Sequence, residues 1–539
     1  MEKLTYPANW SSATLEELLI YVLGGDWGKD NTFNDPNYID VLCIRASELR
    51  NWDKERGETA TLRKVKKSSL ERRELREGDI ILEISGGGPD QPVGRTALID
   101  RAVLSKKTEY KKICTNFFRL IRPSIEINST YLNLYLQSFY KSGKISEYQA
   151  GSNNLRNLKF NDYTQIEIPI APLNEQKRIV AKIEELFSEL DNGIAALKTA
   201  REQLKVYRQA ILKHAFEGKL TAKWREENAD KLETSEQLLS RIQKERDTRY
   251  QHQLEKWKAA VKEWEARGKE GKKPGKTKQS SCPISLSNDE VENLPQVPLG
   301  FTYTYLANIG DLSRGKSKHR PRNDSRLFGG KYPFIQTGEV KAANRKITNF
   351  EQTYSEFGLE QSKLWPIGTL CITIAANIAE TAFLGFDGCF PDSVVGFTAY
   401  NSVLPEYVEL FIKAIRIRIE AYAPATAQKN INLTTLENLV IPYCSTEEQK
   451  QIVDELELQF SIIDKNETEI EQALKLVETL RQSILKKAFS GKLVPQNPND
   501  ESASKLLARI KAEKDPQKKS VKKLATKQDL IKVSNEAYN

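Results

Sequence analysis

Residues 310–317, with the sequence Gly-Asp-Leu-Ser-Arg-Gly-Lys-Ser, match the written pattern of a phosphate-binding P-loop. That chemistry requires a buried strand before the loop and a helix after it, whose N-terminus faces the phosphates. The six residues after Ser317 contain a proline and four basic side chains without an apolar stripe, and no apolar strand ending in an acidic residue is present to hold magnesium. We therefore interpret this segment as a basic loop that contacts a nucleic-acid backbone. Its candidate contact residues are Arg314, Lys316, Lys318, Arg320 and Arg322.

A glycine-rich loop spans residues 85–95, Ser-Gly-Gly-Gly-Pro-Asp-Gln-Pro-Val-Gly-Arg. It is too rich in proline to cradle a phosphate and close onto a helix. Its glycines allow close backbone approach to a ligand, and glutamine and arginine are side-chain types that read base edges. A DNA-contacting loop and a simple connecting loop both stay open. The candidate contact residues are Ser85, Gly86, Gly87, Gln91 and Arg95.

Two polar loops, residues 151–157 and 426–430, stand at equivalent places before two long repeated segments. Their amide and basic groups suit contacts to bases and phosphates. A polar loop in water is the alternative, but the paired position favours a binding function. A further amide, Asn377, lies in a small-residue loop of the second half. These candidates are Ser152, Asn153, Asn154, Arg156, Asn377, Gln428, Lys429 and Asn430.

Other catalytic patterns are weak. The segment Asp35–Tyr38 falls one residue short of the Asp-Pro-Pro-Tyr tetrapeptide of amino-methyltransferases, and no glycine-rich cofactor loop after a strand accompanies it, so we read it as a turn. Three histidines do not assemble into a hydrolase triad without guesswork. The six cysteines are scattered without a C-x-x-C pair, which favours buried or idle thiols over a disulfide or zinc framework. We therefore assign no catalytic residue, no metal ligand and no cofactor to this chain.

The net charge of +9 is concentrated in two segments. Residues 241–278 contain 13 basic and 6 acidic side chains, and residues 505–532 contain 10 and 3, so together they carry +14 and leave −5 elsewhere. Nucleic-acid binding by the globular parts would therefore use local patches. No run of residues is apolar enough to span a membrane, and the N-terminus lacks a signal-peptide core, which predicts a soluble, cytoplasmic protein.

The elements that must position these loops come from a repeat. Residues 157–228 return as residues 430–500 at an offset of 273, and ten of thirteen positions agree between residues 208–220 and 481–493. A weaker echo links residues 235–247 to residues 503–515 at an offset of 268. Two copies of one module, each with a variable and a constant part, predict a pseudo-two-fold symmetric protein.

Within each copy, apolar residues recur at steps of three and four, which predicts a helix of about 40 residues and about 60 Å. Asn174 and Ser445 are the expected N-caps, and Gly218 and Gly491 stand where helix-ending glycines belong. Each helix needs a partner for its stripe, and we expect the two to pair as an antiparallel coiled coil, with homodimerisation as the alternative. The expected pairing positions are Ile183, Leu190, Leu197, Leu204, Ile211, Leu456, Ile463, Ile470, Val477 and Ile484.

The remaining regions divide the chain further. Short β-type runs such as residues 80–84 and 370–374, each after a glycine turn, predict two α+β globules. The fold class is therefore α+β, with two globules separated by the paired helices. The expected segments are a first globule at 1–170, a helical region at 171–228, a charged helical extension and linker at 229–293, a second globule at 294–442, a second helical region at 443–493 and a basic extension at 494–539.

This arrangement resembles the specificity subunit of type I restriction-modification enzymes, in which two target-recognition domains alternate with two conserved helical regions. The likeness is carried by residues 168–180 and 441–453, by the two Ile-Leu-Lys-x-Ala-Phe-x-Gly-Lys-Leu endings, by residues 294–301 and by Gly338–Val340 after Pro333–Ile335. It covers nearly the whole chain. The charged extension and the C-terminal tail are longer than the minimal pattern, and their role stays open.

The resemblance implies a non-catalytic DNA-binding subunit. Each recognition domain would read one half of a split double-stranded DNA site, and the helices would act as spacer and docking surface for two methyltransferase subunits and, through them, restriction subunits. S-adenosylmethionine, ATP and magnesium would belong to those partners. Two other classes stay open: a P-loop ATPase or stand-alone methyltransferase would bind nucleotide or methyl donor by itself, and a plain coiled-coil scaffold would not bind DNA.

Overall fold

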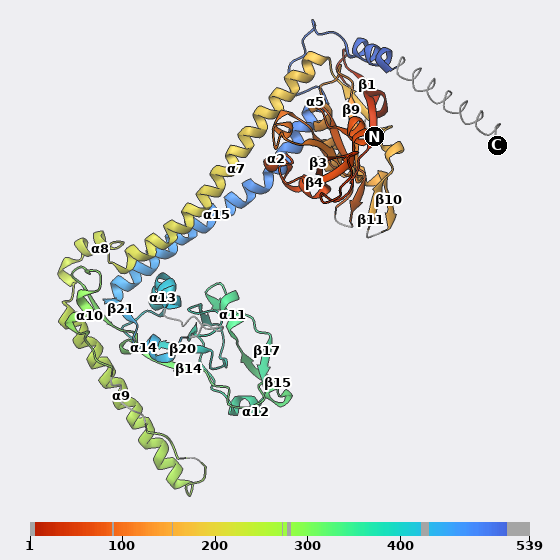
Figure 1. The fold of residues 1–539 in the computed structure, drawn as a ribbon. Helices are drawn as coiled ribbons and strands as arrows, with labels where there is room; N and C mark the ends of the chain where they lie inside the picture. The colour runs from red at the N-terminus through yellow and green to blue at the C-terminus, as the bar shows by residue number, and fades with distance from the viewer. Residues whose placement is uncertain are drawn as a thin grey trace. The chain divides into compact units, whose positions relative to one another are not determined.

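In the computed structural model, the described residues are 6–88, 91–152, 155–271, 273–276, 282–421 and 431–514. The chain divides into two compact units. Unit 1 comprises residues 1–197 and 471–539, and unit 2 comprises residues 198–470. Each unit mixes helices and sheets (Figure 1), which confirms the predicted α+β class. Among the described residues, no helix has the length and apolar character needed to cross a membrane.

Mostly antiparallel sheets form the globular part of unit 1, with one parallel pair between β3 (Tyr38–Ile44) and β8 (Lys111–Cys114). The largest has the strand order β2 (Leu19–Gly24), β9 (Phe118–Pro123), β5 (Ile80–Glu83) and β7 (Thr96–Leu98), and all four residues of β5 are buried. The other strands are β4 (Thr61–Lys66), β3 and β8 in a second sheet, β10 (Gln149–Ser152), β11 (Leu155–Leu158) and β6 (Ser85–Gly87) in a third, and β1 (Ser11–Thr14) with β12 (Glu167–Ile170). The helices are α1 (Leu15–Leu18), α2 (Trp52–Glu55), α3 (Lys67–Arg73), α4 (Arg101–Leu104), α5 (Ser129–Lys141) and α6 (Phe160–Tyr163).

Unit 2 is built around a five-stranded sheet. Its order is β14 (Gly310–Arg314), β20 (Val394–Ala399), β18 (Leu370–Thr373), β19 (Thr381–Leu384) and β16 (Lys346–Ile347), with a parallel β16–β19 pair. The other strands are β15 (Phe328–Phe334) with β17 (Gln352–Tyr354), and β13 (Phe301–Tyr305) with β21 (Val440–Cys444). The helices are α8 (Ala222–Glu227), α9 (Ser235–Ala266), α10 (Asn288–Glu292), α11 (Thr337–Ala342), α12 (Glu356–Glu360), α13 (Pro405–Ala421) and α14 (Leu433–Glu437).

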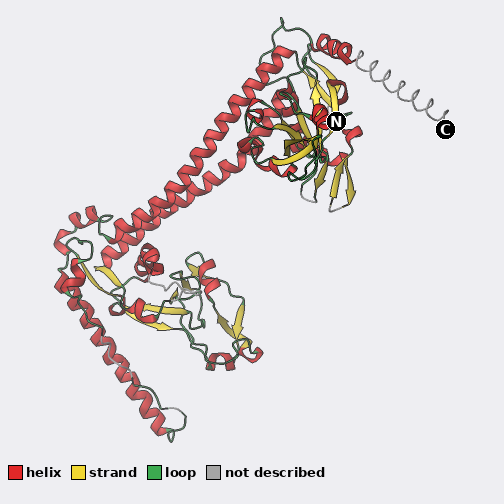
Figure 2. Cartoon of the chain, in the orientation of Figure 1, coloured by secondary structure: helices red, strands yellow, loops and turns green. Residues whose placement is uncertain are grey.

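Two helices of 44 residues each, α7 (Leu173–Phe216) and α15 (Thr446–Phe489), confirm the predicted long helices (Figure 2). Each is about 66 Å long at the rise of an α-helix. Ser445 is the N-cap of α15, because its hydroxyl accepts from the Glu448 backbone N–H at 3.2 Å. The prediction for Asn174 is wrong. The helix already begins at Leu173, since the preceding proline and leucine fit a first turn whose N–H groups need no partner within the helix.

The two helices pair antiparallel through contacts that occur once in each unit. In unit 2, Arg208 of α7 forms an ion pair with Asp464 of α15, and its guanidinium lies 4.8 Å from the Phe460 ring. In unit 1, the residues at the same positions of the other copy make the same contacts, since Arg481 of α15 pairs with Asp191 of α7 and lies 4.9 Å from the Phe187 ring. This reciprocity is what antiparallel packing of two copies of one helix produces.

The ten expected pairing positions are all buried or half-buried. Those inside the hydrophobic cores of the units are fully buried, namely Ile183, Ile211, Leu456 and Ile463. The six that keep partial exposure are Leu190, Leu197, Leu204, Ile470, Val477 and Ile484. Partial exposure is expected where two helices pack without a third element over the seam. The ten positions therefore lie on the less exposed side of the two helices, with the deepest burial next to the globules.

Helix ends meet the globules in the same way in both units. Phe489 at the end of α15 packs on the buried Tyr131 of α5, with ring centroids 5.2 Å apart, and Phe216 at the end of α7 packs on the buried Tyr407 of α13 at 5.1 Å. The chain therefore leaves each long helix at a fixed place, directly after this phenylalanine. Gly218 follows with φ +70°, and a Cβ there would lie 2.6 Å from Pro298 Cγ. Gly491 has the same φ and approaches a proline in the same way, which explains why both copies keep a glycine.

The repeated Glu-Gln dipeptide fixes each globule to the start of its helix. Gln176 accepts from the backbone N–H of Asn128 just before α5, at 3.0 Å. Gln449 accepts from the backbone N–H of Leu404 just before α13, at 2.9 Å. Both glutamines are buried, so Gln176 holds the start of α5 against α7 and Gln449 holds the start of α13 against α15.

The glutamates of the same dipeptide are buried with different partners. Glu175 accepts from Trp10 Nε1 at 3.0 Å and Gln496 Nε2 at 2.6 Å. Glu448 instead forms an ion pair with Arg225, a residue of α8. Burial raises the pKa of both carboxyl groups. Both copies therefore bury a glutamate at the start of the long helix, but different side chains donate hydrogen bonds to it.

The weaker repeat that links residues 235–247 to residues 503–515 also has a structural basis. Leu238 and Ile242 of α9 lie in the core of unit 2. Leu506 and Ile510, at the corresponding positions of the helix formed by residues 503–514, lie in the core of unit 1. The first turns of the charged extension and of the C-terminal extension are thus parts of the globular cores rather than solvated linkers.

Candidate nucleic-acid interface

The two loops expected to contact DNA in the first globule are adjacent. Strand β6 of the glycine-rich loop pairs with β11 of the amide-rich loop, so that Gly87 lies opposite Arg156 and Ser85 lies opposite Asn157. The β10–β11 hairpin completes this three-stranded sheet, with its backbone passing through Ser152. Asn153 and Asn154, at the hairpin tip, lie outside the described residues. Two loops about 70 residues apart in the sequence therefore share one small sheet.

Glycine is required at this sheet for two different reasons. Gly86 adopts φ +104°, a left-handed conformation that other residues rarely take, and its Cβ position faces open space. Gly87 is buried, and a Cβ there would lie 2.6 Å from the Gln91 carbonyl oxygen. Arg156 is half-buried, and no carboxylate among the described residues pairs with it. An exposed glycine edge next to an arginine fits close backbone approach by a phosphate.

Arg95 is already engaged within the globule. Its guanidinium donates to both carboxylate oxygens of Glu83, at 2.8 and 2.5 Å, and the Glu83 side chain is 1% exposed. The Gln91 amide oxygen, turned toward the same guanidinium, lies 2.8–3.0 Å from its nitrogens. A base contact by Arg95 would require this buried ion pair to open. Arg95 and Gln91 thus brace the glycine-rich loop in the structure.

In unit 2, the P-loop pattern does not have the P-loop conformation. Gly310–Arg314 forms β14 at the edge of the sheet, and residues 315–324 after it form no helix. Gly315 is buried, and a Cβ there would overlap the Phe390 and Pro391 carbonyl oxygens. Packing therefore accounts for this glycine. The pattern arose without the strand–loop–helix geometry that a nucleotide phosphate needs.

The lysine and arginine side chains at the end of β14 and in the loop after it are exposed and fall into two groups. Arg314 donates to the Asp392 carbonyl oxygen at 2.9 and 2.6 Å, and Arg322 pairs with the Asp392 carboxylate at 3.0 Å. Arg320 donates to backbone carbonyls within its own loop. Lys316 and Lys318 are exposed, and no carboxylate among the described residues pairs with either. These two lysines are the candidates with amines open to a phosphate.

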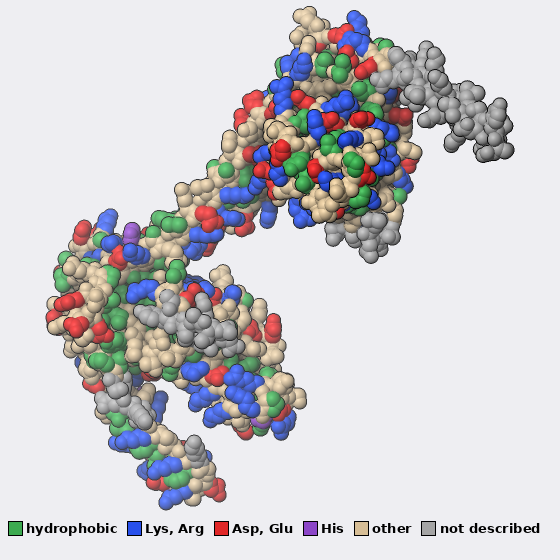
Figure 3. All heavy atoms as spheres, in the orientation of Figure 1, with side chains coloured by type: hydrophobic (Ala, Val, Ile, Leu, Met, Phe, Trp, Pro, Cys, Tyr) green, Lys and Arg blue, Asp and Glu red, His purple; other side chains and the backbone are tan. Residues whose placement is uncertain are grey.

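A hydrogen-bonded turn holds the end of this basic loop. His319 Nε2 lies 2.7 Å from the Asp324 carboxylate. Hydrogen bonds from Arg326, and then from His319, hold the pKa of Asp324 well below its usual range. Figure 3 shows Lys and Arg side chains gathered around this part of unit 2, near α12 and β15. Hydrogen bonds thus hold the end of the loop, and its surface is positively charged.

The loop after β18 contains features that the sequence does not reveal. Ala376 and Ala379 adopt φ values of +63° and +57°, which are uncommon for residues with a side chain. Between them, Asn377 accepts from Lys341 of α11 at 3.3 Å. Backbone strain of this kind concentrates at functional sites. Lys341 and the two alanines therefore join Asn377 as candidates, whereas Gln428, Lys429 and Asn430 lie outside the described residues.

The cysteine side chains of the described residues are mostly buried. Five of the six cysteines, all except Cys282, are buried free thiols. Burial raises the pKa of the Cys114 thiol to about 12, so it is neutral and unreactive near pH 7. No group of three or more potential metal ligands occurs among the described residues.

Comparison with known proteins identifies relatives over the whole length. A family model described as the type I restriction modification DNA specificity domain matches residues 7–199 and 306–476. The chain is 25% identical over 520 residues to the specificity subunit of the type I restriction enzyme EcoKI of Escherichia coli strain K12, covering 94% of this chain and 96% of that protein. It is 24% identical over 536 residues to the StySPI specificity subunit of Salmonella potsdam, covering 95% and 97%.

A solved structure shares the fold. The crystal structure of the HsdS subunit from Thermoanaerobacter tengcongensis aligns with a TM-score of 0.55 at 17% identity, covering 90% of this chain and 98% of that one. At this level of identity the likeness concerns architecture alone.

Proposed function

We propose that this chain, which belongs to the type I restriction-modification DNA specificity family, reads a split double-stranded DNA site with one globular domain for each half. Membership follows from the family model, which matches more than half of the chain. The chain is therefore a DNA sequence-specificity subunit, and such subunits are the non-catalytic members of their systems. The split site is the further step, and it rests on the repeat of one globule-and-helix module.

The observation that carries this proposal is that each unit offers one polar or basic loop surface on a globule that is joined to the long helices by an equivalent contact. In unit 1 it is the β6–β10–β11 sheet with Arg156. In unit 2 it is the loop after β14 with Lys316 and Lys318, together with Asn377. Two modules linked by continuous helices multiply their separate affinities for DNA, provided that both half-sites are engaged at once.

Docking of partner proteins is supported by apolar side chains on the outside of the paired helices. Apolar side chains that lie side by side on an exposed surface mark interaction sites, whereas single exposed ones do not. In unit 2, Leu458 and Ile462 of α15 are 55% and 47% exposed, and four-residue spacing puts them on one face. In unit 1, Leu476 and Leu480 repeat this arrangement at 53% and 41%. We expect two methyltransferase subunits to bind these faces and restriction subunits to join through them.

Cofactors belong to the partners in this proposal. S-adenosylmethionine would bind the methyltransferase subunits, and ATP and magnesium would serve the restriction subunits. This chain would supply sequence recognition and geometry, and the complex would act on DNA in the cytoplasm.

The proposal is tested by mixing the purified chain with its methyltransferase subunit and weighing the particles with and without duplex DNA. We expect one chain to recruit two methyltransferase subunits, and the complex to bind DNA. If the isolated chain binds ATP or S-adenosylmethionine, an enzyme class is correct instead. If the complex assembles but never binds DNA, the chain is a scaffold.

A further inference from the structure

Helix α9 has an anchored half and a projecting half. Along the anchored half, Ser235 donates to the Phe301 carbonyl oxygen at 3.2 Å, Arg246 to Asn308 at 2.8 Å and Arg249 to Asp311 at 3.1 Å. Contacts thus advance along α9 in the same order as along residues 301–311. The helix and β14 therefore run in the same direction, and β14 leads directly into the basic loop. Beyond Arg249, α9 continues toward the side of unit 2 on which that loop lies.

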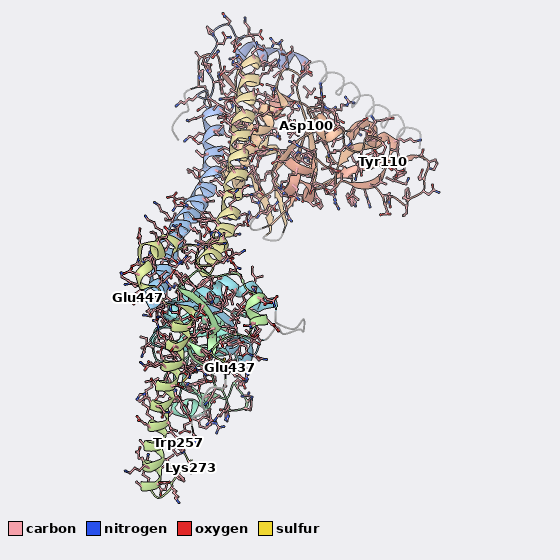
Figure 4. The ribbon with its side chains drawn as sticks, turned by 90° about the vertical axis from the view of Figure 1, so that its left-hand side faces the viewer. Asp100, Tyr110, Trp257, Lys273, Glu437 and Glu447 are labelled. Atoms are coloured by element: carbon pink, nitrogen blue, oxygen red, sulfur yellow. The ribbon has the colours of Figure 1, made fainter. Side chains whose placement is uncertain are left out.

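The projecting half forms an arm, which we define as the described residues of the range 250–276, that is 250–271 and 273–276. It extends about 25 Å past Arg249 at the rise of an α-helix. The chain then folds back along the helix, where Trp257 Nε1 donates to the Pro274 carbonyl oxygen at 3.0 Å and Trp264 Nε1 to the Gly271 carbonyl oxygen at 3.1 Å. Figure 4 shows Trp257 and Lys273 on this arm. Among the described residues, no hydrogen bond or ion pair joins the arm to the globule of unit 2.

The arm is positively charged, and much of its charge is not neutralised. Residues 250–276 contain eight basic and four acidic side chains. Six lysines of the arm are exposed, and no carboxylate among the described residues pairs with any of them. They are Lys256, Lys258, Lys262, Lys269, Lys273 and Lys276. Figure 3 shows such side chains along the part of α9 that extends beyond the globule. A rigid arm with open amines attracts a polyanion.

We propose that the α9 arm binds the phosphate backbone of DNA that flanks the half-site read by unit 2. This inference rests on the proposed function, because a duplex held by the basic loop is the polyanion on that side of the unit. Lysines fit phosphates as point charges and carry no bidentate pattern for bases, so the contact adds affinity without adding sequence information. The arm thereby extends the footprint of the subunit on DNA beyond the recognised bases.

The test measures DNA affinity of the complex with its methyltransferase subunits across a salt series. One duplex carries the mapped recognition site with long flanks, and a second ends at the recognised bases. The variant is Lys256→Gln with Lys258→Gln and Lys262→Gln, since glutamine keeps helix propensity. We expect weaker binding of the long duplex and a shallower dependence of log K on log salt, by about 0.9 for each lost contact. Binding of the short duplex should not change.

A matched control removes negative charge from the same helix, with Glu255→Gln, Glu263→Gln and Glu265→Gln. It should strengthen binding of the long duplex. The proposal is overturned if the lysine variant binds the long duplex with unchanged affinity and salt dependence. It is also overturned if that variant loses assembly with the restriction subunit while DNA binding stays intact, because the arm then docks a protein. If the unmodified complex binds neither duplex specifically, the proposed function itself fails.

Discussion

The buried pair of Arg225 and Glu448 gives the sharpest prediction about stability. Their side chains are 9% and 1% exposed. Arg225→Met keeps much of the side-chain volume but removes every donor. Glu448 is then left with the Thr221 hydroxyl at 2.6 Å, and the Gly218 carbonyl loses its arginine donor. Removing one partner of a buried ion pair costs about 3–5 kcal/mol, because the remaining charge is uncompensated.

The sign of the pH dependence follows from the same carboxyl group. Burial already raises the pKa of Glu448 in the folded protein, and loss of Arg225 raises it further. Protonation of Glu448 therefore stabilises the folded variant. This stabilisation is lost as the pH rises from the pKa of glutamate in the unfolded chain, near 4.3, through the higher pKa of Glu448 in the folded protein. We expect the destabilisation by Arg225→Met to be greater at pH 8 than at pH 5.

Hydrogen exchange is the suitable assay, since a chain of two units need not unfold in one step. Peptides covering residues 221–227 and 446–453 report the local free energy of opening. Glu448→Gln added to Arg225→Met should restore most of the loss, because no charge is then buried. In unit 1, Gln496→Met should cost less, about 1.5–3 kcal/mol, since Glu175 keeps its bond from Trp10. A loss below about 1 kcal/mol for Arg225→Met, or no recovery in the double variant, would refute this reasoning.

Five further substitutions, in three experiments, test the paired helices and the basic loop. Gly218→Ala should lower the free energy of unfolding by more than about 1 kcal/mol, because Gly218 has a positive φ and lies close to a proline. Gly193→Ala, at an open helical position, should raise the free energy of unfolding by up to about 1 kcal/mol. Thermal unfolding of both variants tests this pair. Ile463→Ala should cost about 2–5 kcal/mol and the half-buried Val477→Ala distinctly less in denaturant unfolding, so equal losses would contradict the packing of the seam. Lys316→Ala should leave ATP turnover by the assembled complex intact at saturating DNA and reduce the salt dependence of DNA binding by about 0.9, whereas lost turnover with unchanged DNA binding would restore the P-loop hypothesis.

Local sequence patterns predict the helices, the turns and the buried strands well. The spacing of apolar residues identifies the seam, because only one face of each helix can be buried, and the glycine turns before residues 80–84 and 370–374 lead into β5 and β18. Ser445 caps its helix as expected. Asn174 does not, since a proline and a leucine before it can already occupy helical positions.

Partners distant in the sequence are not predictable from such patterns. Arg95 has the side chain of a base-reading residue, but its pairing with Glu83 depends on how β5 and β7 meet in the sheet. The helix of residues 503–514 shows an apolar spacing, yet nothing local indicates that it completes the core of the first globule. Strain at Ala376 likewise arises from a tertiary turn and leaves no sequence signature.

Exchange of one globule tests the central claim most directly. Residues 1–160 would be replaced by the corresponding domain of another specificity subunit, together with the helix of residues 503–514 that packs on it. Long-read mapping of methylated adenines in a host carrying the complete system then reads the recognised site. Because each globule is joined to the helices by its own copy of the Glu-Gln contact, we predict that one half of the site changes while the other half and the spacer stay the same. A change in both halves, or in neither, would contradict the modular account.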